Sequence, residues 1–256
     1  MDTPLSKPCL EIRDIHMSFG ALQAIDGVSF KVLLGERHAL LGTNGAGKTT
    51  MFNVITGDLV PTAGTVHLYS RDITKLPAHK RCKLGIGRTY QIPLLFSDLS
   101  VLENILVAVR GPKLGGVSVV RMQESANWYA AARDICAKVG IEQLAYANVF
   151  ELSHGQKKQL ELGMALATMP SVLLLDEPAA GLSPSDRKTL IDLINGLPRD
   201  LTILFIEHDM EVALTLADRV TVMKDGKVFA SGTPKEIRED EQVLRLYLGE
   251  PLVATS

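Results

Sequence analysis

The chain has 256 residues, of which 46% are apolar and 22% are charged, as in ordinary globular proteins. This composition excludes a disordered, collagen-like or coiled-coil chain. The formal net charge is −2, from 27 basic and 29 acidic residues, and this near balance argues against a nucleic-acid partner. We therefore expect one large or two small globular domains that bind no nucleic acid.

Two further classes are disfavoured. No apolar run reaches the roughly 18 residues of a membrane-spanning helix, and residues 1–13 lack the pattern of a secretory leader. Cys9, Cys82 and Cys136 are far apart and lack the spacing of metal ligands. We therefore expect three reduced thiols and a cytoplasmic protein.

Alternating apolar residues predict strands near the start of the chain, at residues 10–19, 28–32 and 38–41. Asp26-Gly27 predicts the turn between the first two strands. The third run ends on Gly42, and a helix is predicted from Lys48 to about Thr56 with Gly57 as its stop. The local order is therefore strand, glycine-rich loop, helix.

Helices are predicted next, at residues 99–109, 126–139 and 156–167, with a glycine-rich loop at 111–116. Continuous apolar runs at 172–175 and 201–206 then predict strands that are covered on both faces. Asp225-Gly226 predicts a hairpin, and residues 234–248 predict one or two amphipathic helices. The pattern indicates an α/β domain that a helical insertion interrupts.

The glycine-rich loop carries the first chemical motif. Its sequence from Gly42 to Thr49, GTNGAGKT, fits the phosphate-loop pattern between a strand and a helix. The glycines let backbone N–H groups surround a β-phosphate, and the helix N-terminus adds its positive dipole end. Lys48 would supply a charge to the β- and γ-phosphates, and Thr49 would offer its hydroxyl to Mg²⁺.

Two other motifs suit the same chemistry. The apolar run at 172–175 ends on Asp176, which would hold hydrated Mg²⁺, and on Glu177, which would polarise a water molecule. Ser153 and Gln156 form a capping-box pattern at the start of a helix, and this helix start is either an ordinary cap or a second anion site. A lone histidine after a strand, such as His208, is usually a surface or cap residue.

These motifs, in this order, resemble the ATP-binding cassette (ABC) ATPases, and the resemblance covers essentially the whole chain. It implies an α/β fold: a P-loop NTPase core with an antiparallel β portion and an inserted helical subdomain. The core would comprise residues 1–91 and 168–256, and the helical subdomain residues 92–167. The resemblance also implies ATP hydrolysis with ATP and Mg²⁺ as ligands.

The resemblance implies a role for each motif residue. Glu177 would be the catalytic base, His208 the switch histidine and Gln91 the glutamine that senses nucleotide, while Thr49, Gln91 and Asp176 would bind Mg²⁺. Residues 179–183 would be the D-loop and residues 152–156 the signature motif. The nucleotide-binding residues would be Phe19, which stacks on adenine unless it is a core residue of its strand, and Gly42, Thr43, Asn44, Gly45, Ala46, Gly47, Lys48, Thr49, Thr50, Ser153, His154, Gly155 and Gln156.

The same resemblance implies partners. Two cassettes, identical or different, would pair head to tail, so that each ATP lies between the phosphate loop of one and the signature motif of the other. Transmembrane permease subunits would dock on the helical subdomain, would hold the protein peripherally on the inner face of the plasma membrane, and would link it indirectly to a solute-binding protein. The sequence departs from the family pattern at His154, where glycine is usual, at Phe19, where tyrosine is commoner, and at Thr43, where proline is frequent.

Less specific motifs indicate one branch of the family. Residues 85–91, 101–104, 179–183 and 247–250 resemble cassettes of branched-chain (hydrophobic) amino-acid uptake systems and their urea and amide relatives. A lipopolysaccharide-export-type cassette is the nearest alternative among transporters. A soluble ABC ATPase of the iron–sulfur-assembly kind is the alternative outside them, whereas a DNA-repair or translation ATPase is disfavoured by the missing coiled-coil insertion and second cassette.

Overall fold

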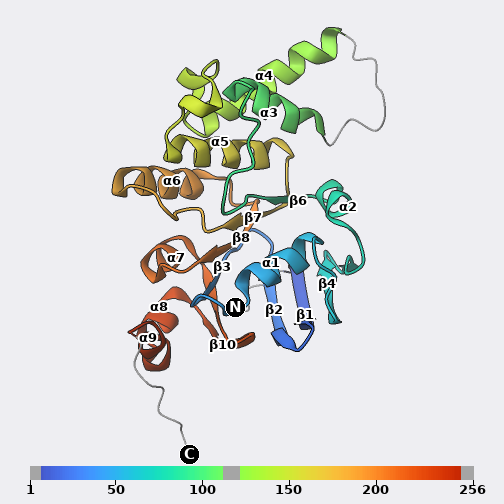
Figure 1. The fold of residues 1–256 in the computed structure, drawn as a ribbon, viewed down its shortest axis with the longest axis vertical. Coiled ribbons are helices and arrows are strands. Elements are labelled where there is room, and N and C mark those ends of the chain that lie inside the picture. Colours follow the sequence, from blue (N-terminus) through green and yellow to red (C-terminus); the bar gives the residue numbers. More distant parts are fainter. Residues whose placement is uncertain (1–6, 112–121, 249–256) are drawn as a thin grey trace, which may run out of the picture. The chain divides into compact units, whose positions relative to one another are not determined.

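The computed structural model describes residues 7–111 and 122–248 (Figure 1). The chain divides into two compact units, which are described separately below. The first unit comprises Met1–Arg81 and Arg199–Ser256, and the second comprises Cys82–Pro198. The predicted boundaries at residues 91 and 168 separate a core that contains strands from a helical insertion, and they stay a prediction. The predicted loop at 111–116 lies outside the described residues, except for Gly111, which ends a helix.

An antiparallel sheet forms part of the first unit, with strand order β2-β1-β4-β5. Its strands are β1 (Pro8–Phe19), β2 (Leu22–Leu33), β4 (Ala63–Leu68) and β5 (Arg71–Asp72). The predicted turn at Asp26-Gly27 is wrong, because β1 and β2 turn after Phe19, with Gly20 at φ +60°. Gly27, at φ +72°, instead lies inside β2 where the register shifts, and a glycine there accommodates the bulge.

The second sheet of the first unit surrounds β3 (Arg37–Gly42), which pairs in parallel with β8 (Thr202–Glu207) and β9 (Arg219–Lys224). Every residue of β3 and β8 is buried, which confirms for β8 the prediction of a strand covered on both faces. β9 continues into β10 (Lys227–Gly232) through Asp225 and Gly226, at φ +50° and +75°. Two positive φ angles are typical of the tight hairpin turn predicted there.

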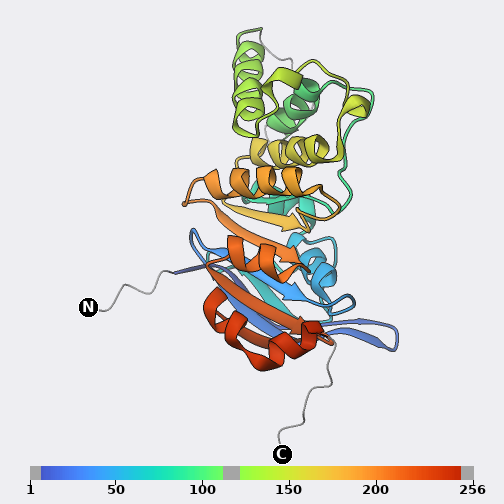
Figure 2. The same ribbon diagram turned by 90° about the vertical axis from the view of Figure 1, so that its left-hand side faces the viewer.

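Short helices accompany these sheets. α1 (Lys48–Thr56) ends at Gly57 in the left-handed conformation, as predicted. The sequence patterns do not predict α2 (Ala78–Lys83), whereas α7 (Met210–Leu216) follows Asp209, which caps it. The predicted C-terminal helical region forms two helices, α8 (Pro234–Glu239) and α9 (Glu241–Leu248), and α8 packs on β9, β10 and α9 (Figure 2).

One buried arginine ties the end of α1 to the segment that follows β5. Arg81 is fully buried, and burial lowers its pKa to about 10. Its guanidinium donates hydrogen bonds of 2.7–2.8 Å to four carbonyl oxygens, those of Val54, Ile55, Thr74 and Leu76. Gly57 makes room for this group, since a Cβ there would lie 2.6 Å from Arg81 Nε.

Replacing Arg81 with methionine is therefore expected to lower the free energy of unfolding by about 3 kcal/mol, because buried carbonyls lose their donors. Urea denaturation of purified protein measures the change. Lys80→Met is the matched control, since Lys80 is exposed next to Arg81 and should change stability by less than about 0.5 kcal/mol. Equal free energies of unfolding for the two variants would show that the hydrogen bonds of Arg81 do not stabilise the fold.

The second unit combines a parallel strand pair with helices. β6 (Ile86–Arg88) pairs with β7 (Val172–Asp176), whose residues are all buried. The three predicted helices are confirmed with small shifts as α3 (Val101–Arg110), α4 (Met122–Lys138) and α5 (His154–Ala167), which pack on one another (Figure 2). α6 (Pro184–Gly196) packs on α5, and 3₁₀ turns cover Glu142–Leu144 and Val149–Glu151.

The state of the cysteines and the apolarity of the helices both agree with the expectations from the sequence. Cys9, Cys82 and Cys136 are free, as predicted, and burial raises the pKa of the Cys9 and Cys136 thiols. Within residues 7–111 and 122–248, none of the helices has both the length and the apolarity to cross a membrane.

Candidate functional site

The phosphate loop of the first unit begins where β3 ends. Gly42, Gly45 and Gly47 have φ angles of +158°, +80° and +96°, a backbone path that side chains rarely adopt. A Cβ on Gly47 would lie 2.6 Å from the Ala24 carbonyl oxygen, so this position has no room for another residue. Gly47 is also the N-cap of α1 and has no side chain to cap the helix, which leaves N–H groups directed at the loop.

Lys48 lies against the inside of this loop. Its ammonium donates hydrogen bonds to the carbonyl oxygens of Gly42 at 2.7 Å and Thr43 at 3.0 Å, and the residue is only 6% exposed. Thr49, one residue further along α1, is exposed, and Thr50 is half-buried. The predicted charge and hydroxyl therefore both lie in the first turn of α1, beside uncapped helix N–H groups.

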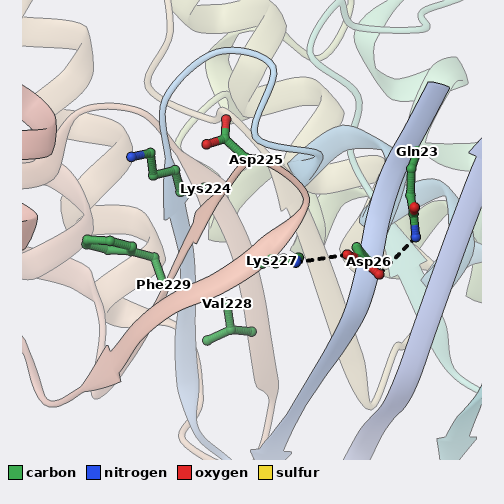
Figure 3. Close-up of a pocket in the computed structure, with 7 residues that line it drawn as sticks. All are labelled: Gln23, Asp26, Lys224, Asp225, Lys227, Val228 and Phe229. Carbon is green, nitrogen blue, oxygen red and sulfur yellow. Dashed lines mark hydrogen bonds and ion pairs between the residues drawn. The ribbon is translucent and has the colours of Figure 1, made fainter. Parts of the chain in front are cut away.

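The β9–β10 hairpin supports the loop from one side. Gly226 N–H donates to the Ala46 carbonyl oxygen at 3.3 Å, and Asp26 N–H donates to the Gly226 carbonyl oxygen at 2.8 Å. A cavity of about 560 Å³ lies on this hairpin (Figure 3). At this cavity, Lys227 Nζ forms an ion pair with Asp26 Oδ2 at 3.0 Å, so the hairpin contacts β2 as well as the loop.

Two other predicted site residues belong to the first unit. Phe19 ends β1 and is 47% exposed, which excludes the alternative of a strand-core residue. His208 is exposed directly after β8, where Asp209 accepts N–H hydrogen bonds from Glu211 and Val212 to cap α7. The His208 imidazole therefore lies at the carboxyl end of β8. In parallel sheets, ligands bind at the edge formed by the carboxyl ends of the strands.

In the second unit, Asp176 ends β7 and is 3% exposed. Arg88 donates to its Oδ2 at 3.1 Å, and Asp176 N–H donates to Thr89 Oγ1 at 3.2 Å. Burial raises the pKa of this carboxyl group, and Glu177 adds to the rise while Arg88 opposes it. The acidic group is therefore held at a fixed position by the neighbouring strand β6 and the residue after it.

Glu177 follows in a left-handed conformation, with φ +45°, so the chain turns sharply at the strand end. Gln91 is exposed, and its Nε2 donates to Glu177 Oε2 at 3.0 Å. The two residues are 86 positions apart in the sequence, and the structure brings their side chains together. A glutamine amide at this distance restricts the orientation of the carboxylate that is predicted to activate water.

The start of α5 is a capping box, as predicted. Gln156 N–H donates to Ser153 Oγ at 3.2 Å, and Ser153 N–H donates to Gln156 Oε1 at 2.9 Å. The Ser153 hydroxyl still has its own hydrogen to donate. Both residues of the cap and His154 next to them are exposed or half-buried, so this helix start is open to an anion as well as capped.

Gly155 of the predicted signature motif and Gly181 of the predicted D-loop both lie close to other side chains. A Cβ on Gly155 would lie 2.7 Å from Asp186 Cγ of α6, so a larger residue there would displace the Asp186 side chain. The His154 imidazole lies beside Gly181, whose φ is +71°, with Nε2 3.4 Å from where a Cβ would be. The unusual histidine therefore lies next to the predicted D-loop of its own unit.

Part of this arrangement was not predicted from the sequence. Arg88 and Thr89, which hold Asp176, and Lys158 and Glu161, which hold the backbone beside Gln91, were not identified. Burial raises the pKa of Glu161 to about 7. The available signal was a lysine and a glutamate three positions apart on the predicted helix, which places both on one face.

Comparison with known proteins agrees with this geometry. A family profile described as "ABC transporter" matches residues 25–180, and one described as "Branched-chain amino acid ATP-binding cassette transporter" matches residues 227–252. The high-affinity branched-chain amino acid transport ATP-binding protein BraF of Pseudomonas aeruginosa is 38% identical, covering 96% of this chain and 100% of that protein. The corresponding LivG protein of Salmonella typhimurium is 36% identical at the same coverage.

More distant relatives share the fold. The lipopolysaccharide export system ATP-binding protein LptB of Acidithiobacillus ferridurans is 33% identical, covering 94% of this chain and 97% of that protein. The crystal structure of the ADP conformation of MJ1267, an ATP-binding cassette of an ABC transporter, has a TM-score of 0.84 and 31% identity, covering 96% of this chain and 100% of that one. With the predicted fold class thus confirmed, the chain belongs to the ABC transporter family and is one of its ATP-hydrolysing, ATP-binding cassettes.

Proposed function

We propose that this cassette drives an importer for branched-chain or other hydrophobic amino acids, or for a related small amide. The observation that carries the proposal is the 36–38% identity, across nearly the whole chain, to ATP-binding proteins of branched-chain amino acid transport. The match of residues 227–252 to a branched-chain amino acid cassette family supports the same cargo class.

Lipopolysaccharide export is the second candidate, because a cassette of that system is 33% identical over a similar length. Membrane vesicles containing this chain and candidate permease subunits would be tested for ATP-dependent uptake of labelled leucine, with a urea or amide solute in parallel. Uptake of either supports the importer. Lipopolysaccharide extraction without uptake would favour the second candidate.

The first unit would bind the triphosphate. The N–H groups at the start of α1 and the Lys48 ammonium surround the position that suits a phosphate, and exposed Phe19 would stack on adenine. The Thr49 hydroxyl, the Asp176 carboxylate and the Gln91 amide each offer an oxygen of the kind that Mg²⁺ binds, and these residues would hold the ion. When bound, Mg²⁺ would neutralise charge that develops on the phosphate oxygens.

The hydrolysis step would depend mainly on positioning. Glu177 would accept a proton from the attacking water, and Gln91, which donates to that carboxylate, would hold it in place. His208 would contact the γ-phosphate from the carboxyl end of β8. In phosphoryl transfer, such orientation and charge stabilisation supply most of the catalysis.

Partners are part of the proposal. A second cassette would complete each nucleotide site with Ser153, His154, Gly155 and Gln156. Permease subunits would dock on the helical subdomain, residues 92–167, and keep the protein at the inner face of the membrane. A solute-binding protein would act on the opposite face of the membrane. Exposed Ile92, Leu94 and Phe96, which follow Gln91, support docking of an apolar permease segment.

Shared sites make a testable prediction. In a mixture of Lys48→Ala and Ser153→Arg subunits, each heterodimer would have one site with both lesions and one with neither. Phosphate release from the mixture should therefore exceed that of either variant alone, provided that one working site suffices. The long charged arginine at position 153 blocks the facing nucleotide.

A control separates blockage from loss of the helix cap. Ser153→Ala removes the capping oxygen, at a cost of about 1 kcal/mol in stability, but adds no bulk. It should keep more activity than Ser153→Arg. No recovery in the mixture, after heterodimers are demonstrated by tagged copurification, would contradict the shared-site arrangement.

A further inference from the structure

The backbone beside Gln91 is held in an unusual way. Among the described residues, Tyr90–Leu95 form no backbone–backbone hydrogen bond, so no strand or helix fixes the path of this segment. Its hydrogen bonds come instead from two side chains of α5. Glu161 Oε1 accepts from Tyr90 N–H at 2.6 Å, and Lys158 Nζ donates to the carbonyl oxygens of Tyr90 at 3.1 Å and Gln91 at 2.8 Å.

Both of these side chains are ionisable, and both are buried. Lys158 is 3% exposed and Glu161 is 6% exposed, and their charged atoms lie 3.8 Å apart. Burying such groups costs free energy, which their mutual attraction and specific hydrogen bonds offset. Here those hydrogen bonds go to consecutive main-chain groups of one short segment, and its next side chain, Gln91, reaches Glu177 at 3.0 Å.

The Tyr90 ring is fixed from a second direction. The Arg88 guanidinium lies 4.7 Å from the ring centroid while it donates to Asp176 at 3.1 Å. The main chain of Tyr90 is thus held by α5, and its ring is held by the arginine that holds Asp176. The direction in which the Gln91 side chain leaves the backbone follows from these contacts.

We propose that Lys158 and Glu161 are positioning residues, which hold the main chain of Tyr90 and Gln91 so that the Gln91 amide reaches Glu177. This inference rests on the role proposed above for Gln91. Loss of either side chain would let the segment relax and would misdirect the amide. A misplacement of about 1 Å at a reacting group lowers the rate by as much as about a hundredfold.

The test compares three variants of the full chain with wild type. Lys158→Met should lower kcat by at least about tenfold and leave the KM for ATP within about threefold, because the phosphate loop is unchanged. Lys158→Arg, which keeps a donor to the carbonyls, should recover part of the loss. Lys157→Met makes the same chemical change one residue away, on a half-buried lysine that does not bind the segment, and should leave kcat unchanged.

A double-mutant cycle separates positioning from a purely structural role. If Lys158 acts through Gln91, Lys158→Met combined with Gln91→Ala should be no slower than Gln91→Ala alone. If instead the loss of kcat in the double variant is the product of the losses in the two single variants, the proposal is overturned. Glu161→Gln, which keeps volume and an acceptor oxygen but removes the charge, provides the same cycle if Lys158→Met does not fold.

The outcomes also distinguish this inference from the proposed function. If Gln91→Ala lowers kcat while Lys158→Met and Glu161→Gln do not, only the positioning role is overturned. If Gln91→Ala leaves kcat at the wild-type value, the proposed role of Gln91 fails, and the positioning role fails with it.

Discussion

Replacement of Glu177 by glutamine is expected to lower ATP turnover by about a hundredfold or more, because the amide cannot accept the proton of the attacking water. Glutamine has the same shape, so the turn at φ +45° and the contact with Gln91 at 3.0 Å should survive. ATP binding should be retained, since the phosphate loop is unaltered. Phosphate release under saturating ATP and Mg²⁺ measures the turnover.

The same variant should accumulate an ATP-bound dimer, detectable by size-exclusion chromatography, since closure survives while hydrolysis is blocked. Glu151→Gln is the matched control, because Glu151 is an exposed carboxylate of the same unit. It should behave as wild type. Wild-type phosphate release from the Glu177→Gln protein would remove Glu177 from the role of base.

Lys48→Ala should weaken ATP binding by at least about tenfold, or about 1.4 kcal/mol, through loss of the charge that faces the phosphates. The structure adds a second consequence: the carbonyl oxygens of Gly42 and Thr43 lose their ammonium donor. Calorimetric titration with ATP in the presence of Mg²⁺ measures the affinity. Thermal unfolding of the same samples shows whether the loop has also lost stability.

Lys31→Ala controls for loss of a positive charge in the first unit. Its ammonium is exposed and lies 3.7 Å from Glu11, so removal should leave ATP affinity unchanged. Should Lys48→Ala bind ATP as tightly as wild type, residues 42–49 would be a glycine turn and no phosphate loop.

Local signals were sufficient for many elements. Gly57 ends α1, the Ser153–Gln156 box begins α5, and Asp225-Gly226 makes the hairpin turn, each as predicted. These signals act over a few residues, where backbone conformation and hydrogen bonding depend little on the rest of the chain. Asp26-Gly27 is the informative failure, because the same dipeptide also suits a bulge inside a strand.

Short elements with weak patterns escaped prediction. β4 has no fully alternating pattern, and β5 and β6 are only two and three residues long. Such strands form because a neighbour is present: β4 pairs with β1, and β6 pairs with β7, far along the chain. Their conformation is decided by tertiary contact, which periodicity within a short window does not report.

The sequence by itself determined the chemical classes of the site: the loop from Gly42 to Thr49, the acidic pair Asp176 and Glu177, and the capped start of α5. Each depends on residue types at fixed local spacing. Only the tertiary structure decided what holds them, since Gln91 meets Glu177 across 86 positions and Lys158 meets the Gln91 backbone across 67. Contacts between distant segments depend on how the strands and helices pack, and neither local propensity nor motif spacing encodes that packing.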